Sequence, residues 1–134
     1  STAEDRAMRL MGLVWTKAPN DAISAASQDV IRQQRPAGGW SQLPTLEPDA
    51  YATGLSLIAL NEAGMRVDDR VYRRGVDFLL ATQYPDGAWF VRTRSFPVQP
   101  YFESGFPFDR HQWISAAGTA WAAQAIARTL PDRR

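Results

Sequence analysis

One seven-residue pattern occurs twice in this chain and constrains its fold more than any other feature. Residues 34–40 read QRPAGGW and residues 83–89 read QYPDGAW, so that Q-x-P-x-G-x-W recurs at an offset of 49 positions. A period of this size is typical of arrays of helix pairs, in which each unit is stabilised by its neighbours. The pattern therefore predicts two copies of one helical unit.

The three fixed positions suit a structural turn at the end of a helix. A Gln amide can donate to the carbonyls that a helix end leaves without partners, and Gly permits the positive φ of a sharp reversal. A Trp ring adds a large apolar surface and one N–H donor that can hold the turn against a neighbouring helix. We interpret these residues as a structural motif: Gln34, Gly38, Trp40, Gln83, Gly87 and Trp89.

Apolar residues follow helical spacing through most of the chain. We expect a first helix opened by Thr2 and Asp5, a second capped by Asn20, and three more at about 48–63, 69–83 and 111–128. The third is apolar around most of its circumference, which predicts burial on two sides. Alternation with period two is missing, so the sequence predicts an all-α fold, with repeat 1 at about 20–64 and repeat 2 at about 69–130.

The second copy extends upstream into a longer motif. Residues 74–90 read RGVDFLLATQYPDGAWF, which resembles the QW motif of the terpene cyclase and prenyltransferase superfamily, squalene–hopene cyclases included. The first copy departs from it upstream, where Ala25-Ala26 and Val30-Ile31 stand. The resemblance implies a single α/α-toroid-like domain over 1–134, in which such motifs tie successive outer helices together. Because a full toroid needs more helices, we expect a partial toroid, part of a longer protein, or a chain that pairs with another copy.

The catalytic marks of that superfamily do not occur here. The resemblance would imply an Asp-x-Asp-Asp acid motif, but only Asp49 stands near a matching position. Zinc-dependent prenyltransferases use an Asp, a Cys and a His, whereas this chain has no cysteine and one histidine, His111. His111 with Asp109 and Glu103 would be an atypical zinc set. We expect no cofactor and no metal.

The second repeat carries an aromatic insertion at about 92–110. From Trp89 to Gly118 there are 29 positions, against 14 from Trp40 to Gly54, and residues 96–113 read FPVQPYFESGFPFDRHQW. Inserted segments of a repeat array often form its binding face. The candidate binding residues are the aromatic ones: Phe96, Tyr101, Phe102, Phe106, Phe108 and Trp113.

Three interpretations of the insertion remain open. In the one we favour, its rings form a packed cap over the open end of the array. In the second, it is a lid or an interface beside an apolar pocket. In the third, Glu103 or Asp109 is a general acid with His111 as its partner, although Asp109 also fits the N-cap of the last helix.

Charge and hydropathy narrow the functional classes. The 15 basic and 14 acidic residues give a net charge of +1, which provides no overall field for nucleic acid. The densest basic cluster, at positions 66, 70, 73 and 74, is interleaved with Asp and reads as a solvated helix face. No apolar run approaches the length of a membrane span.

These observations favour a non-catalytic repeat module with a structural, interaction or apolar-ligand-binding role. Its expected partners are another protein chain, remaining toroid repeats, a second copy or an apolar ligand. The alternative is part of a terpene cyclase-like enzyme that acts on an isoprenoid. A weaker option, a carbohydrate-processing toroid, needs a carboxylate pair across a cleft, and no such pair stands out.

Overall fold

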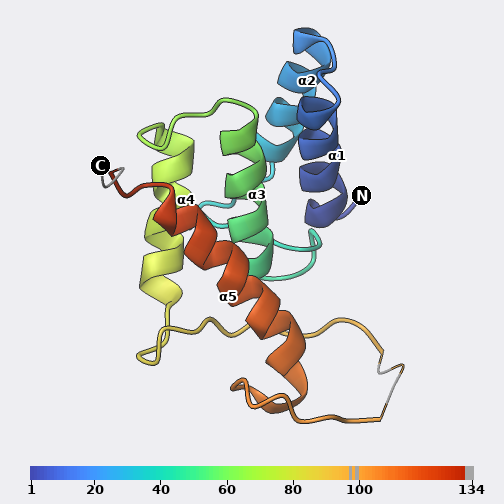
Figure 1. The fold of residues 1–134 in the computed structure, drawn as a ribbon, viewed down its shortest axis with the longest axis vertical. Coiled ribbons are helices and arrows are strands. Elements are labelled where there is room, and N and C mark those ends of the chain that lie inside the picture. The colour runs from blue at the N-terminus through green and yellow to red at the C-terminus, as the bar shows by residue number, and fades with distance from the viewer. Residues whose placement is uncertain (97, 99, 132–134) are drawn as a thin grey trace.

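A computed structural model describes residues 1–96, 98 and 100–131, and over these residues the chain is all-α (Figure 1). The only extended pairing among them is one isolated bridge between Trp40 and Asp49. The helices are α1 (Ala3–Trp15), α2 (Asn20–Ile31), α3 (Ala50–Glu62), α4 (Arg70–Thr82) and α5 (Gln112–Ala127), with a short 3₁₀ turn, η1 (Asp109–His111), before α5. The predicted all-α class with about five helices is confirmed, and the last three helices begin and end within two residues of the predicted limits.

Side-chain caps open three of these helices. In α1, Thr2 accepts from the Asp5 amide at 3.0 Å while Asp5 accepts from the Thr2 amide at 2.7 Å, which is the predicted capping box. Asp49 accepts from the third residue of α3, Ala52, and Asp69 accepts from the second residue of α4, each at 2.8 Å. Local sequence is therefore sufficient to begin these helices.

Two predicted caps are wrong. Asn20 is the first residue of α2, and Pro19 precedes it in the cap position without a side-chain hydrogen bond. The proline ring restricts the φ angle of Pro19, and the helix begins directly after it. Asp109 does not cap α5, since it belongs to η1 with φ of 51° and His111 occupies the position before the helix.

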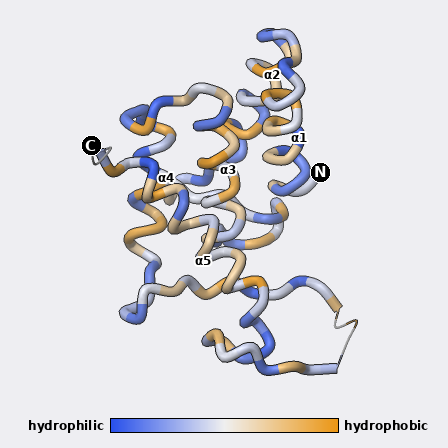
Figure 2. The backbone as a smooth tube through the Cα atoms, in the orientation of Figure 1, coloured by the Kyte–Doolittle hydropathy of each residue, from blue (hydrophilic) through white to orange (hydrophobic). Residues whose placement is uncertain are grey.

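Helix α3 lies at the centre of the fold. It packs against α5, α1 and α4, while α2 packs mainly on α1. All residues from Ala52 to Leu60 are buried, as the apolar sequence of this helix predicts. Hydrophobic colours concentrate on the central helices in Figure 2, and hydrophilic ones on the turns between them.

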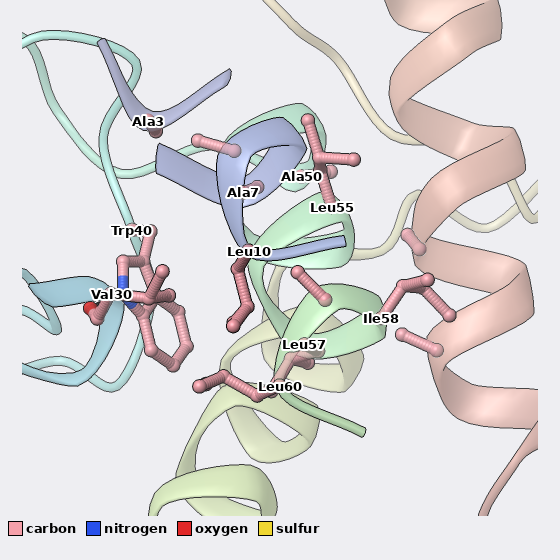
Figure 3. Packing of buried hydrophobic residues seen from close by; sticks show 14 of the residues in the cluster. Ala3, Ala7, Leu10, Val30, Trp40, Ala50, Leu55, Leu57, Ile58 and Leu60 are labelled. Carbon is pink, nitrogen blue, oxygen red and sulfur yellow. The ribbon is translucent and has the colours of Figure 1, made fainter. Parts of the chain in front are cut away.

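The core forms on two sides of α3, as Figure 3 shows. On one side Leu57 and Leu60 converge with Leu10 of α1 and with Trp40, and on the other side Ile58 points toward α5. Two glycines bring α3 and α5 together. A Cβ on Gly54 would lie 2.6 Å from the Ala122 nitrogen, and one on Gly118 would lie 3.2 Å from the Tyr51 nitrogen. The helix crossing therefore depends on the absence of side chains at both positions.

Candidate functional site

The first Gln–Trp turn (34–40) ties three parts of the fold together. The Gln34 amide donates to the Gly38 carbonyl at 2.9 Å and to the Val71 carbonyl of α4 at 2.8 Å. The indole N–H of buried Trp40 donates to the Val30 carbonyl at 2.8 Å. These bonds close the turn, fix it to the end of α2 and hold α4 against it.

The second Gln–Trp turn (83–89) repeats the bonds within the turn. The Gln83 amide donates to the Gly87 carbonyl at 2.9 Å, and the indole N–H of Trp89 donates to the Leu79 carbonyl at 2.8 Å. Gly38 and Gly87 both have positive φ, of 97° and 87°. The shared pattern of the sequence thus corresponds to a shared set of hydrogen bonds.

Arg74 lies on α4 and binds the first turn, so it does not belong to a solvated face. Its guanidinium donates to the carbonyls of Pro36 at 2.8 Å and Arg35 at 3.2 Å, and more weakly to the Gln34 side-chain oxygen at 3.4 Å. The prediction for the basic cluster holds for Arg66, Arg70 and Arg73, which are exposed, and is wrong for Arg74.

The aromatic insertion does not form a packed cap. Four of its predicted binding residues, Phe96, Tyr101, Phe102 and Trp113, are between 58% and 91% exposed, while Phe106 and Phe108 are half-buried. Figure 1 shows the segment leaving the helices after the second turn and returning in a wide loop to the start of α5. The packed-cap interpretation is therefore wrong for most of these rings.

Polar residues at the start of α5 explain the shape of this loop. The Ser115 hydroxyl accepts from the Val91 amide at 2.9 Å, and the Thr93 amide donates to Nδ1 of His111 at 3.0 Å. The fully buried Gln112 holds the returning segment of the loop, because its amide donates to the Phe102 carbonyl at 3.1 Å. Since both ends of the loop are anchored at the start of one helix, the chain between them projects outward.

A hollow of about 1110 Å³ lies between the loop and the start of α5. Trp113 and Phe102 stack along it with ring centroids 6.2 Å apart, and Arg92 and Arg110 are among the residues of its wall. Among the described residues the lining contains no carboxyl group. It consists of Arg92, Thr93, Ser95, Phe96, Val98, Pro100, Tyr101, Phe102, Arg110, His111, Gln112 and Trp113.

A second aromatic group lies beside the hollow. The Phe108 ring packs edge-on against Tyr84, with centroids 5.1 Å apart, and against Phe90, with centroids 5.5 Å apart. Phe90 in turn meets His111 at 5.3 Å. This contact fixes the end of the insertion to the second Gln–Trp turn.

Two of the three predicted catalytic residues, Glu103 and Asp109, lie beside the Tyr101 hydroxyl, whereas His111 makes a different contact. Glu103 accepts from the Gly105 amide at 2.8 Å and from the Tyr101 hydroxyl, which lowers the Glu103 pKa and raises the pKa of Tyr101 to about 12. A carboxyl with a lowered pKa is a poor general acid near neutral pH. His111 uses Nδ1 to accept from Thr93, so its neutral ring carries the proton on Nε2. Neither Glu103 nor Asp109 lines the hollow.

The pKa of the Asp49 carboxyl is shifted in the opposite direction to that of Glu103. Burial raises the pKa of Asp49, although the Ala52 amide and the Gln42 side chain, at 2.7 Å, both donate to it. Arg94 reaches the same cluster by donating to the Gln42 oxygen at 2.8 Å. Asp49 caps α3 and does not line the hollow, so this cluster joins the start of the insertion to the core.

The sequence predicted the aromatic residues of the hollow but not the polar and basic residues that shape it. Gln112 and Ser115 are buried polar residues in an Ala-rich helix, and that placement was the available signal. Arg92 and Arg110 gave no signal, since single arginines in a loop are ordinary surface residues.

Two further observations concern the described part of the chain. Its His, Asp and Glu side chains form no group of three that could hold a metal ion. None of its helices combines the length and apolar character needed to cross a bilayer. Comparison of the chain with protein families, curated proteins and solved structures finds no match.

Proposed function

We propose that this chain is a non-catalytic helical-repeat module, built like a terpene cyclase-type repeat, that binds an apolar ligand with an acidic end group. The observation that carries the proposal is the hollow behind the insertion. Its wall combines exposed aromatic rings with two arginines, and its described lining contains no carboxyl group.

The exposed rings favour binding of an apolar body. Soluble proteins rarely leave large apolar patches open to water unless these serve binding. Phe96, Phe102 and Trp113 together present such a patch, and covering it stabilises a complex by about 25 cal/mol for each Å² of apolar surface removed from water. The hollow, of about 1110 Å³, is slightly larger than the usual range of about 300–1,000 Å³ for small-molecule sites.

The two arginines favour an acidic end group. Guanidinium groups present several N–H donors in a plane that matches a carboxylate or a phosphate. Arg92 and Arg110 come from opposite ends of the insertion and both reach the wall of the hollow. No acidic side chain of the described lining competes with the ligand for them.

The pKa shifts and positions of two acidic residues favour the non-catalytic role. The pKa of Glu103 is lowered, and Asp49, whose pKa is raised, caps α3 outside the hollow. General acid catalysis requires an acid within hydrogen-bond reach of the reacting atom. The described lining offers no carboxyl group for this role, and its histidine, His111, uses Nδ1 to accept from the Thr93 amide.

The proposal is tested with a fluorescent dansyl fatty acid of eleven carbons as the probe. We expect saturable binding, weakened about tenfold by Trp113→Ala because the ring loses its contact with the chain, a change of about 1.4 kcal/mol. Trp15→Ala is the control, since Trp15 is an exposed Trp of α1 outside the hollow.

A comparison of the fatty acid with the matching alcohol tests the acidic end group and the apolar body of the ligand separately. Arg92→Gln with Arg110→Gln should weaken binding of the fatty acid and leave binding of the matching alcohol nearly unchanged. If the probe does not saturate, or if Trp113→Ala and Trp15→Ala have equal effects, the hollow is not a site for such ligands.

A further inference from the structure

The start of the aromatic insertion is held in place by side chains rather than by the backbone. Among the described residues from 90 to 107, no backbone amide donates to a backbone carbonyl. Instead, the Ser115 hydroxyl accepts from the Val91 amide at 2.9 Å and donates to the Val91 carbonyl at 3.1 Å. Two residues further on, Nδ1 of His111 accepts from the Thr93 amide at 3.0 Å. The path of the chain along the hollow therefore depends on a few side-chain contacts.

Of the side chains that hold the insertion, His111 is the one whose acceptor a proton can remove near neutral pH. Imidazole is the side chain that ordinarily changes its charge between pH 5 and pH 8. A neutral ring accepts through Nδ1, whereas an imidazolium carries an N–H on both nitrogens and accepts nothing. The Ser115 hydroxyl and the side-chain oxygens of Gln42 and Gln112 keep their acceptors throughout this range. One proton on His111 therefore breaks its bond with the Thr93 amide.

The ring of His111 lies in a cationic part of the structure. It is half-buried, meets the Phe90 ring edge-on with centroids 5.3 Å apart, and directly precedes the first residue of α5. The N-terminus of a helix carries a partial positive charge, which repels a further cation. The charged and titratable residues around the ring are Arg92, Tyr101 and Arg110, which line the same hollow, and Asp109 of η1.

Most of these neighbours keep the same charge while His111 titrates. Arg92 and Arg110 remain cationic, and Tyr101 remains neutral because its pKa is raised to about 12. Asp109 is an exposed carboxyl beside the Tyr101 hydroxyl. A proton on His111 therefore adds a charge to a wall that already holds two arginines.

Release of the Thr93 amide is confined to a short piece of chain. On one side Val91 keeps both of its bonds to α5, and on the other side the Arg94 guanidinium donates to the buried Gln42 at 2.8 Å. Between these fixed points lie Thr93 itself and Arg92, which belongs to the wall of the hollow. Loss of the bond to His111 therefore frees this arginine and leaves the rest of the insertion anchored.

We propose that His111 is a pH-sensitive anchor of the hollow. While the ring is neutral, Nδ1 holds the Thr93 amide and keeps Arg92 in the wall. When Nδ1 takes a proton from water, the Thr93 amide loses its acceptor and this part of the wall loosens. Because the anchored state needs the unprotonated nitrogen, anchoring is complete at higher pH and is lost as the pH falls. The consequence for a ligand rests on the proposed function: the hollow would hold an acidic end group through one arginine fewer.

Solvent exchange of the backbone amides, measured by NMR at pH 7.5 and pH 5.5, tests the proposal on the full chain without ligand. The rates are compared as protection factors, which remove the intrinsic effect of pH on exchange. We expect protection of the Thr93 amide to fall about fivefold to tenfold at pH 5.5, the effect of losing one hydrogen bond, and protection of the Val91 amide to stay nearly constant. Since His111 is the single histidine of the chain, the Thr93 amide shift should follow its imidazole signals with the same midpoint.

His111→Asn is the matched variant, because its side-chain oxygen takes the place of Nδ1 and accepts at either pH. The Thr93 amide should then keep its protection at pH 5.5, whereas in His111→Ala it should be unprotected at both pH values. The proposal is wrong if Thr93 in the unchanged protein stays protected at pH 5.5, if Val91 loses protection together with it, or if His111→Asn keeps the pH dependence. It is also wrong if the midpoints of the Thr93 amide and the imidazole differ. Because no ligand is present, the anchor and the proposed ligand site can fail separately.

Discussion

Gly38→Ala is expected to lower the free energy of unfolding by about 3–5 kcal/mol, from left-handed strain and a steric clash together. Gly38 has φ of 97°, which an L side chain adopts only with strain. Its Cβ would also lie 2.3 Å from the backbone oxygen of Arg74, which cannot move without shifting α4. The change should appear in urea unfolding followed by far-UV circular dichroism.

The chain supplies matched controls for this substitution. Gly87 and Gly64 have φ of 87° and 99°, but a Cβ on Gly87 meets only its own Gln83 at 3.9 Å and one on Gly64 meets nothing within 4 Å. Alanine at either position should cost about 1–2 kcal/mol, from strain alone. Equal losses at Gly38 and Gly87 would contradict the statement that a helix covers only the first turn.

Trp40→Ala and Trp89→Ala should each lower the free energy of unfolding by about 3–5 kcal/mol, because each removes a large buried ring. Both indoles are buried, and each donates to the carbonyl of a helix end, Val30 in one turn and Leu79 in the other. Thermal unfolding of the two variants provides the measurement, and exposed Trp15→Ala should change the free energy by no more than about 0.5 kcal/mol.

Phenylalanine at the same positions separates the ring from its hydrogen bond. Trp40→Phe and Trp89→Phe keep most of the apolar contact and remove one of two donors, since the Val30 carbonyl keeps the Gln33 amide and the Leu79 carbonyl keeps the Thr82 hydroxyl. The expected cost is about 0.5–1.5 kcal/mol. A small loss for Trp89→Ala beside a large loss for Trp40→Ala would mean that the second turn is not a structural staple.

The helices could be predicted because their signals are local. Thr2 and Asp5 satisfy each other within one turn, and the apolar sequence of α3 predicts burial on two sides. The wrong predictions for Asn20 and Asp109 also have local causes, but N-cap propensities alone do not reveal them. Pro19 takes the cap position from Asn20, and the insertion enters α5 through a 3₁₀ turn in which Asp109 has positive φ.

The candidate site was harder to predict because it depends on tertiary anchors. Aromatic residues are usually buried, so Phe96 and Phe102 pointed to a packed cap. Their exposure follows from Gln112 and Ser115, which fix both ends of the loop to one helix. The sequence of the loop itself does not indicate these anchors. The role of Arg74 could not be predicted for the same reason. Its neighbours in sequence made it resemble a surface residue, and its partners lie about 40 positions away.

The most direct test of the two-turn structure is hydrogen exchange of the Gln34 and Gln83 side-chain amides, measured by NMR. Both amide protons of Gln34 are donated, to the carbonyls of Gly38 and Val71, while Gln83 donates only to Gly87 and is exposed. We predict slow exchange for the Gln34 amide and fast exchange for the Gln83 amide. Equal exchange rates for the two free amides would contradict a covered first turn beside an open second one.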